Sequence, residues 1–153
     1  MKLKASLLTA IIAVSAFSLI GCSNEKQVTL AEIQTAIVKE ELLPQGKQEI
    51  DAKEWWPFEE VKDKIEEGFV SMALMNVKLQ DVVVVKTTDT QAIVDAIEAY
   101  KESSLKLFAG GYGGDENATA VANSILEVKG DYVYFIATPD AANIEAELLK
   151  VIG

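Results

Sequence analysis

A run of four valines lies between Asp81 and Lys86, in the middle of the chain. β-Branched side chains favour strands, and a strand whose consecutive residues are all apolar is usually covered on both faces. The sequence therefore predicts a central strand here. Thr88 or Asp89 then begins a predicted helix that runs to about Lys106. Its apolar stripe consists of Ile93, Ile97 and Tyr100.

Hydrophobic spacing and turn residues predict further elements on both sides of this strand. Before the strand, the sequence predicts a helix over 30–42 after a capping box at 29–32, a short helix from Pro57 to Gly68 with Val61 and Ile65 facing inward, and a strand over 69–75. After it, the sequence predicts a hairpin formed by strands 125–128 and 132–138, and a last helix from Pro139 to Gly153. The expected fold class is α+β, with helices packed on a small three- or four-stranded, largely antiparallel sheet.

The N-terminus has the composition of a secretory signal peptide. Lys2 and Lys4 precede an uncharged apolar run over 5–20, which is shorter than the roughly 20 residues that a membrane-spanning helix needs. The segment Leu19-Ile20-Gly21-Cys22 follows, and it resembles the bacterial lipobox. There the cysteine thiol receives a diacylglyceryl group and cleavage occurs before the cysteine. The alternative is an ordinary signal peptide with a stray or buried cysteine.

These features predict three segments. A signal-peptide helix covers 1–21, a short lipidated linker covers 22–28, and a single α+β domain covers 29–153. Cleavage is expected between Gly21 and Cys22, and Cys22 is the expected lipidation site, with palmitate-type acyl chains. Two acyl chains give stable anchoring. We therefore expect a protein anchored in the cell membrane by lipid and facing outside the cytoplasm.

Charge limits the partners of the mature chain. Cleavage would remove two lysines and no acid, which leaves 12 lysines against 24 acidic residues, a net charge of −12. Such a surface repels nucleic-acid phosphates and anionic headgroups, so membrane attachment would depend on the acyl chains. Because Cys22 is the only cysteine, no intramolecular disulfide can form. The sequence leaves the oligomeric state open.

The chain has no histidine and no arginine, which removes most catalytic arrangements. Ser-His-Asp and Cys-His sites and His/Cys zinc sites cannot form, so we expect no enzyme, cofactor or metal site. Ser103-Ser104-Leu105-Lys106 has the Ser-x-x-Lys spacing of penicillin-recognising enzymes without their other motifs. The segment 115–119 begins like a calcium loop, but Ala120 and Leu126 replace the required glycine and glutamate.

Two segments are candidates for binding. Four glycines surround Tyr112 in 110–114, which is either a connector between helices or a mobile flap that contacts a ligand. Trp55-Trp56-Pro57-Phe58 places three aromatics beside a proline, which either fill the core or form a recognition patch. If both segments lie on one face, that face is the predicted binding site. Its candidate residues are Trp55, Trp56, Phe58 and Tyr112.

The order of elements over roughly 68–152 resembles a family of bacterial lipoproteins found mostly in Gram-positive anaerobes, whose shared domain has no known function. The resemblance rests on the strand 82–86, the helix through 97–101, the Gly/Tyr loop, the hairpin 128–133 and a closing helix. Arginines that the family usually carries before the loop are missing here. The resemblance supports the expected location and implies no activity.

The sequence therefore predicts a membrane-tethered extracytoplasmic lipoprotein that acts as a non-catalytic binding or interaction module. Its partner would be a protein, a peptide or a cell-wall component. The alternative is a small carboxylate- or metal-dependent hydrolase at the cell surface. Facing carboxylates with raised pKa values in a cleft would favour the hydrolase, whereas a shallow aromatic patch would favour the binding module.

Overall fold

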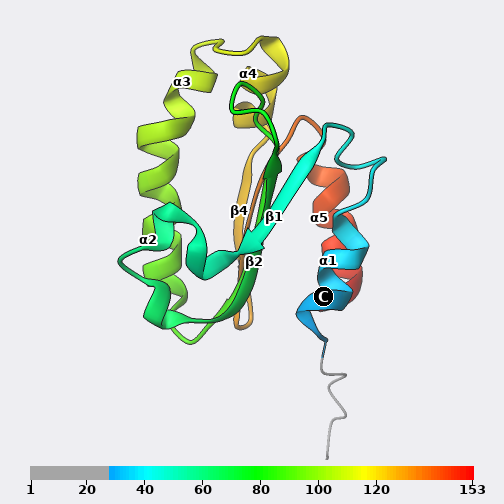
Figure 1. Cartoon of the computed structure of the whole chain (residues 1–153). Coiled ribbons are helices and arrows are strands. Elements are labelled where there is room, and N and C mark those ends of the chain that lie inside the picture. Colours follow the sequence, from blue (N-terminus) through cyan, green and yellow to red (C-terminus); the bar gives the residue numbers. More distant parts are fainter. Residues whose placement is uncertain (1–27) are drawn as a thin grey trace, which may run out of the picture.

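The valine run forms β3 (Asp81–Thr87), the middle strand of a five-stranded sheet with the order β1-β2-β3-β5-β4 (Figure 1). The structure, a computed structural model, describes residues 28–153. β3 pairs antiparallel with β2 (Ile65–Ala73) and with β5 (Tyr132–Ala137). The edge strands β1 (Lys47–Asp51) and β4 (Ile125–Lys129) are also antiparallel to their neighbours.

Helices cover both faces of this sheet. Val82 and Val84 belong to the core shared with α1 (Leu30–Ile37) and α5 (Ala141–Ile152). Val83 and Val85 belong to the core shared with α2 (Thr90–Tyr100). All four valines are completely buried, which confirms the prediction of a central strand covered on both faces. At about 1.5–3 kcal/mol for each buried side chain, this run is a main source of stability.

The helix predicted after β3 forms and is longer than expected. The Asp89 side chain caps α2 by accepting a hydrogen bond from Ala92 N–H at 3.3 Å. A π-helical segment, Lys101–Leu105, continues α2 into α3 (Lys106–Ala109), and α4 (Asp115–Ala122) follows the glycine-rich connection. The predicted hairpin and last helix are confirmed as β4–β5 and α5.

The predicted strand count was too low because β1 was missed. Its sequence, Lys-Gln-Glu-Ile-Asp, has one apolar residue and no clear alternation. Such a strand is stable because it lies at the sheet edge, where its polar side chains remain in solvent while the backbone pairs with β2. The expected strand over 69–75 is confirmed for residues 69–73; β2 begins four residues earlier and ends two residues earlier than expected.

Two predicted helices differ from the observed structure. The capping box between Thr29 and Glu32 forms as predicted, but α1 ends at Ile37 instead of continuing to residue 42. The predicted helix from Pro57 to Gly68 does not form. Two short 3-10 turns, Trp56–Phe58 and Lys62–Lys64, and the first residues of β2 take its place, and another 3-10 turn, Ala52–Glu54, precedes them.

Gly68 has a different role from the predicted one. It lies inside β2, and a Cβ at this position would be 2.8 Å from both the Ala52 Cβ and the Val84 carbonyl oxygen. The glycine therefore lets the first 3-10 turn approach the sheet closely. The sequence predicted that Gly68 ends a helix, and this prediction is wrong.

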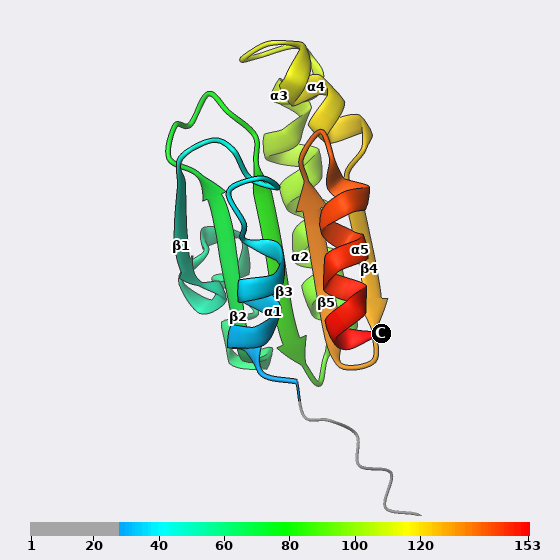
Figure 2. The ribbon, with the colours of Figure 1, turned by 90° about the vertical axis from the view of Figure 1, so that its right-hand side faces the viewer.

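The two ends of the sheet carry different segments (Figures 1 and 2). The described chain starts at Val28 beside the β4–β5 turn and the C-terminus. The β2–β3 connection and the connection between α3 and α4 lie at the opposite end. We call this opposite end the distal end.

Candidate functional site

The four aromatic residues of the predicted binding face differ in how far they are buried. Trp55 and Phe58 are buried, and their rings meet edge to face at 4.9 Å within the α2 side of the core. Trp56 is 63% exposed and packs edge to face on Tyr100 at 5.8 Å. Two of the four candidate residues thus pack in the core, and Trp56 and Tyr112 remain accessible.

The glycine-rich loop 110–114 connects α3 and α4 and is held in place by Asn117. The buried Asn117 amide donates to the Val77 carbonyl at 2.8 Å and to the Tyr112 carbonyl at 2.9 Å. Its side-chain oxygen accepts from Leu79 N–H at 2.9 Å. One side chain therefore joins the glycine-rich loop to the β2–β3 connection.

Gly113 is required at this junction. Its φ is +77°, and a Cβ there would be 2.1 Å from the Val77 carbonyl oxygen. Only a glycine tolerates both this backbone conformation and this close approach. The loop therefore has a specific packed conformation against the β2–β3 connection.

Exposed apolar side chains gather on these two joined segments. We define the distal patch as Leu74, Met75, Val77, Leu107 and Tyr112, whose exposed fractions range from 38% to 63%. Tyr112 also packs against Phe108, with ring centroids 5.8 Å apart. Residues 74–77 and 107–114 contain no charged side chain, although a quarter of the chain is charged. This composition is unusual for a solvated surface and typical of an interaction site.

A buried acid lies on the α2 side of the core. The Tyr100 hydroxyl donates to Asp81 Oδ2 at 2.6 Å, and both residues are buried. Burial raises the pKa of Asp81 to about 6, and the hydrogen bond from Tyr100 opposes this rise. Burial and the nearby Asp81 charge raise the pKa of Tyr100 well above its ordinary value. The carboxyl group thus faces a phenol inside the core.

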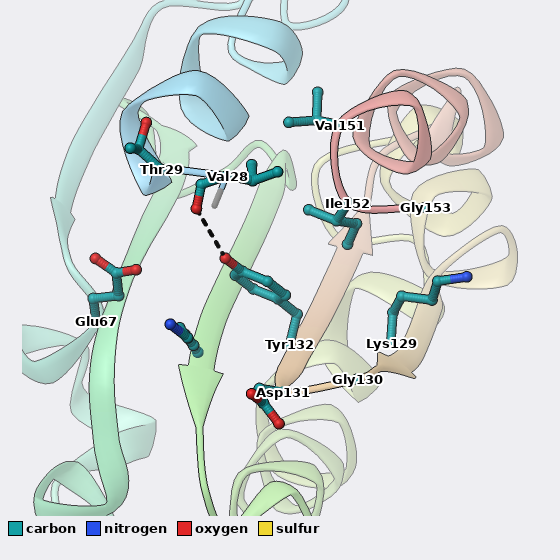
Figure 3. Close-up of a pocket in the computed structure, with 11 residues that line it drawn as sticks. Val28, Thr29, Glu67, Lys129, Gly130, Asp131, Tyr132, Val151, Ile152 and Gly153 are labelled. Carbon is teal, nitrogen blue, oxygen red and sulfur yellow. Dashed lines mark hydrogen bonds between the residues drawn. The ribbon is translucent and has the colours of Figure 1, made fainter. Parts of the chain in front are cut away.

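A cavity of about 820 Å³ lies at the end where the described chain begins (Figure 3). It is bordered by Val28, the β4–β5 turn and the last turn of α5, and the Tyr132 hydroxyl donates to the Val28 carbonyl at 3.4 Å. Lys86 and Lys129 line it together with Glu67 and Asp131. The wall therefore mixes both charges and shows no preference for an anion or a cation.

The other motifs lie on helices. Ser103 donates to the Ala99 carbonyl at 2.8 Å in the π-helical segment, as a solvated helix residue does. Residues 115–119 are the first turns of α4 rather than a calcium loop. Within residues 28–153, no group of three or more His, Cys, Asp or Glu side chains could hold a metal ion.

The expected cleavage and lipidation residues, Gly21 and Cys22, lie outside the described residues. In the described part, no helix is long and apolar enough to cross a membrane.

The distal patch was missed at the sequence level, apart from Tyr112. Its residues come from two segments about 30 positions apart, and each segment alone has the composition of an ordinary loop. The available signal was the absence of charge in 74–77 and 107–114. Asn117 gave no signal, because its role depends on the packing of α4 against the β2–β3 connection.

The central part of the chain matches a known protein family. Residues 47–138 match the family described as a domain of unknown function, DUF4358. The chain belongs to this family. The matched region runs from β1 to the end of β5 and includes the whole sheet and the distal patch. No curated protein and no solved structure matches the chain.

Proposed function

We propose that this member of the DUF4358 family is an extracytoplasmic lipoprotein, anchored by Cys22, whose domain binds a partner without catalysing a reaction. The lipobox-like sequence before Cys22 supports the anchor. The linker 22–28 is short and spans at most about 25 Å when extended. The domain would therefore stand close to the membrane, with the Val28 end towards it.

The observation that carries the binding role is the position of the distal patch. It lies at the end of the sheet opposite Val28, so anchoring would direct it away from the bilayer. Its five exposed apolar side chains lie on segments that Asn117 and Gly113 hold together. A surface fixed before binding loses little conformational entropy when it binds.

The hydrolase alternative receives less support. Its strongest candidate is Asp81, which is buried and has a raised pKa. Its hydrogen-bond partner is the Tyr100 hydroxyl instead of a second carboxylate. Hydrolysis by paired carboxyl groups needs a second acid beside the first, so this geometry gives the hydrolase less support.

Metabolic labelling tests the anchor. Cells that express the full chain are grown with radiolabelled palmitate, and Cys22→Ala is compared with Ser23→Ala as the matched control. We expect label and the cleaved size for the wild type and for Ser23→Ala, but an unlabelled, uncleaved precursor for Cys22→Ala. Normal labelling of Cys22→Ala would contradict the proposed anchor.

Photo-crosslinking in intact cells tests the binding role. The photoreactive residue p-benzoylphenylalanine is placed at Leu107 in the distal patch or at Val128, which is also exposed but lies in β4. We expect a discrete crosslinked product from position 107 and much less from position 128. Equal yields, or no product from position 107, would contradict binding at the distal end.

A further inference from the structure

We infer that the distal patch binds an apolar segment of another protein that is flanked by basic residues, such as a cationic amphipathic helix. This inference rests on the proposed binding function and adds the chemistry of the partner. It follows from the kind of side chain in the patch, the rigidity of its backbone and the charges around it.

The side chains of the patch favour a protein partner. Four of the five are aliphatic or thioether groups, and Tyr112 is the one aromatic. Glycans are bound mainly by flat aromatic rings with polar groups beside them, whereas Leu, Met and Val offer no hydrogen bond. Methionine in particular adapts to varied apolar partner surfaces. The patch therefore fits apolar side chains of a polypeptide.

The backbone beneath the patch is fixed. Asn117 bonds to both segments, and Lys78 in the β2–β3 connection pairs with Glu116 in α4 at 2.9 Å. The Leu74 N–H also donates to the Gly46 carbonyl at 2.8 Å, which attaches the 38–46 loop to the same end. These contacts present the patch as a surface already formed for a helix or an extended segment.

Exposed charges of both signs border the uncharged patch. Asp115 and Glu116 directly follow the glycine-rich loop, Glu40 and Glu41 lie in the attached 38–46 loop, and Lys106 precedes Leu107. Glu40 pairs with Lys47, and Glu116 pairs with Lys78. Glu41 and Asp115 form no ion pair with any residue of the described part, and the mature chain as a whole carries −12. Complementary charge therefore favours lysines or arginines beside the partner's apolar residues.

The same charges disfavour the other occupants. A second copy would bring two molecules of high net negative charge together, and copies anchored in one membrane would point their distal ends in the same direction. The bilayer to which the chain is anchored would lie at the opposite end. An anionic headgroup surface would also be repelled by the net negative charge of the protein.

Fluorescence anisotropy with defined peptides tests the inference. The protein is the chain from position 22 onward with Cys22→Ser, since residues 28–153 contain both cores and the whole sheet. The probes are three labelled 14-residue peptides with one helical pattern, made of leucine and lysine, leucine and glutamate, or serine and lysine. We expect the Leu/Lys peptide to bind at least about tenfold more tightly than the other two, and added salt to weaken it.

Two double variants locate the binding. Leu74→Ser with Leu107→Ser removes apolar groups from the patch, and Val128→Ser with Leu149→Ser removes exposed apolar groups elsewhere. We expect about a tenfold loss of Leu/Lys binding in the first and less than twofold in the second. Circular dichroism checks that both remain folded.

Several results would overturn the inference. They are equal losses in both double variants, tight binding of the Leu/Glu peptide, no binding of any peptide, or a dimer in sedimentation that the Leu74→Ser, Leu107→Ser variant abolishes. A crosslinked product from position 107 in cells would show, in each of these cases, that the binding function stands and that only the partner chemistry is wrong. Absence of that product would instead count against the binding function.

Discussion

The buried Asp81 should make the stability of the domain depend on pH in a specific direction. Its pKa is about 6 in the folded protein, against an ordinary value of 3.8. The folded state therefore binds the proton more tightly than the unfolded state. The stabilisation that accompanies this proton is complete below pH 3.8 and is lost as the pH rises through 6.

The size of the effect follows from these two values. Their difference corresponds to about 3 kcal/mol in total, at 1.36 kcal/mol for each pH unit. Between pH 5 and pH 8 the expected loss is about 1.4 kcal/mol. Asp81→Asn keeps an acceptor for the Tyr100 hydroxyl but cannot ionise, so this part of the pH dependence should disappear.

Urea unfolding at pH 5 and pH 8 measures this difference. Subtracting the pH dependence of Asp81→Asn from that of the wild type cancels the contributions of other carboxyl groups. A residual near 1.4 kcal/mol, with the wild type relatively less stable at pH 8, supports the reasoning. A residual near zero, or one of opposite sign, would show that the pKa of Asp81 is not raised by burial. Asp89→Asn, which alters a partly exposed capping residue of α2, is the control for loss of a charge.

Two further predictions concern the distal loop and the aromatic residues. Gly113→Ala should destabilise the domain by about 2 kcal/mol or more, because its Cβ would meet the Val77 carbonyl at a positive φ. Gly111→Ala, also at positive φ but with open space around it, should cost less in the same urea titration. Trp55→Ala should cost about 3–5 kcal/mol because it empties the core, whereas Trp56→Ala should cost well under half of that. Equal costs within either pair would contradict the packing described.

The elements that could be predicted from sequence are those with strong local patterns. The four valines and the Asp89 cap specify β3 and α2 through local propensity and burial. β1 could not be found this way, because an edge strand keeps polar side chains in solvent and depends on pairing with β2. The first 3-10 turn packs closely on the sheet at Gly68, which is a tertiary contact between Ala52 and β2.

The candidate site was less predictable for the same reason. Trp55 and Trp56 are adjacent in sequence, yet one packs between Phe58 and Tyr100 and the other faces solvent. The distal patch depends on the meeting of the β2–β3 connection with α4, which brings Val77 next to Asn117. Composition can indicate apolar, uncharged segments, but it cannot show that they form one surface.

We propose that the distal end of an anchored domain binds a partner. The most direct measurement is the yield of crosslinked product in intact cells from position 107 relative to that from position 128. We predict a discrete product whose yield from position 107 is several times larger, and which decreases when Leu74→Ser is added. Equal yields from the two positions, or a yield unaffected by Leu74→Ser, would contradict binding at the distal end.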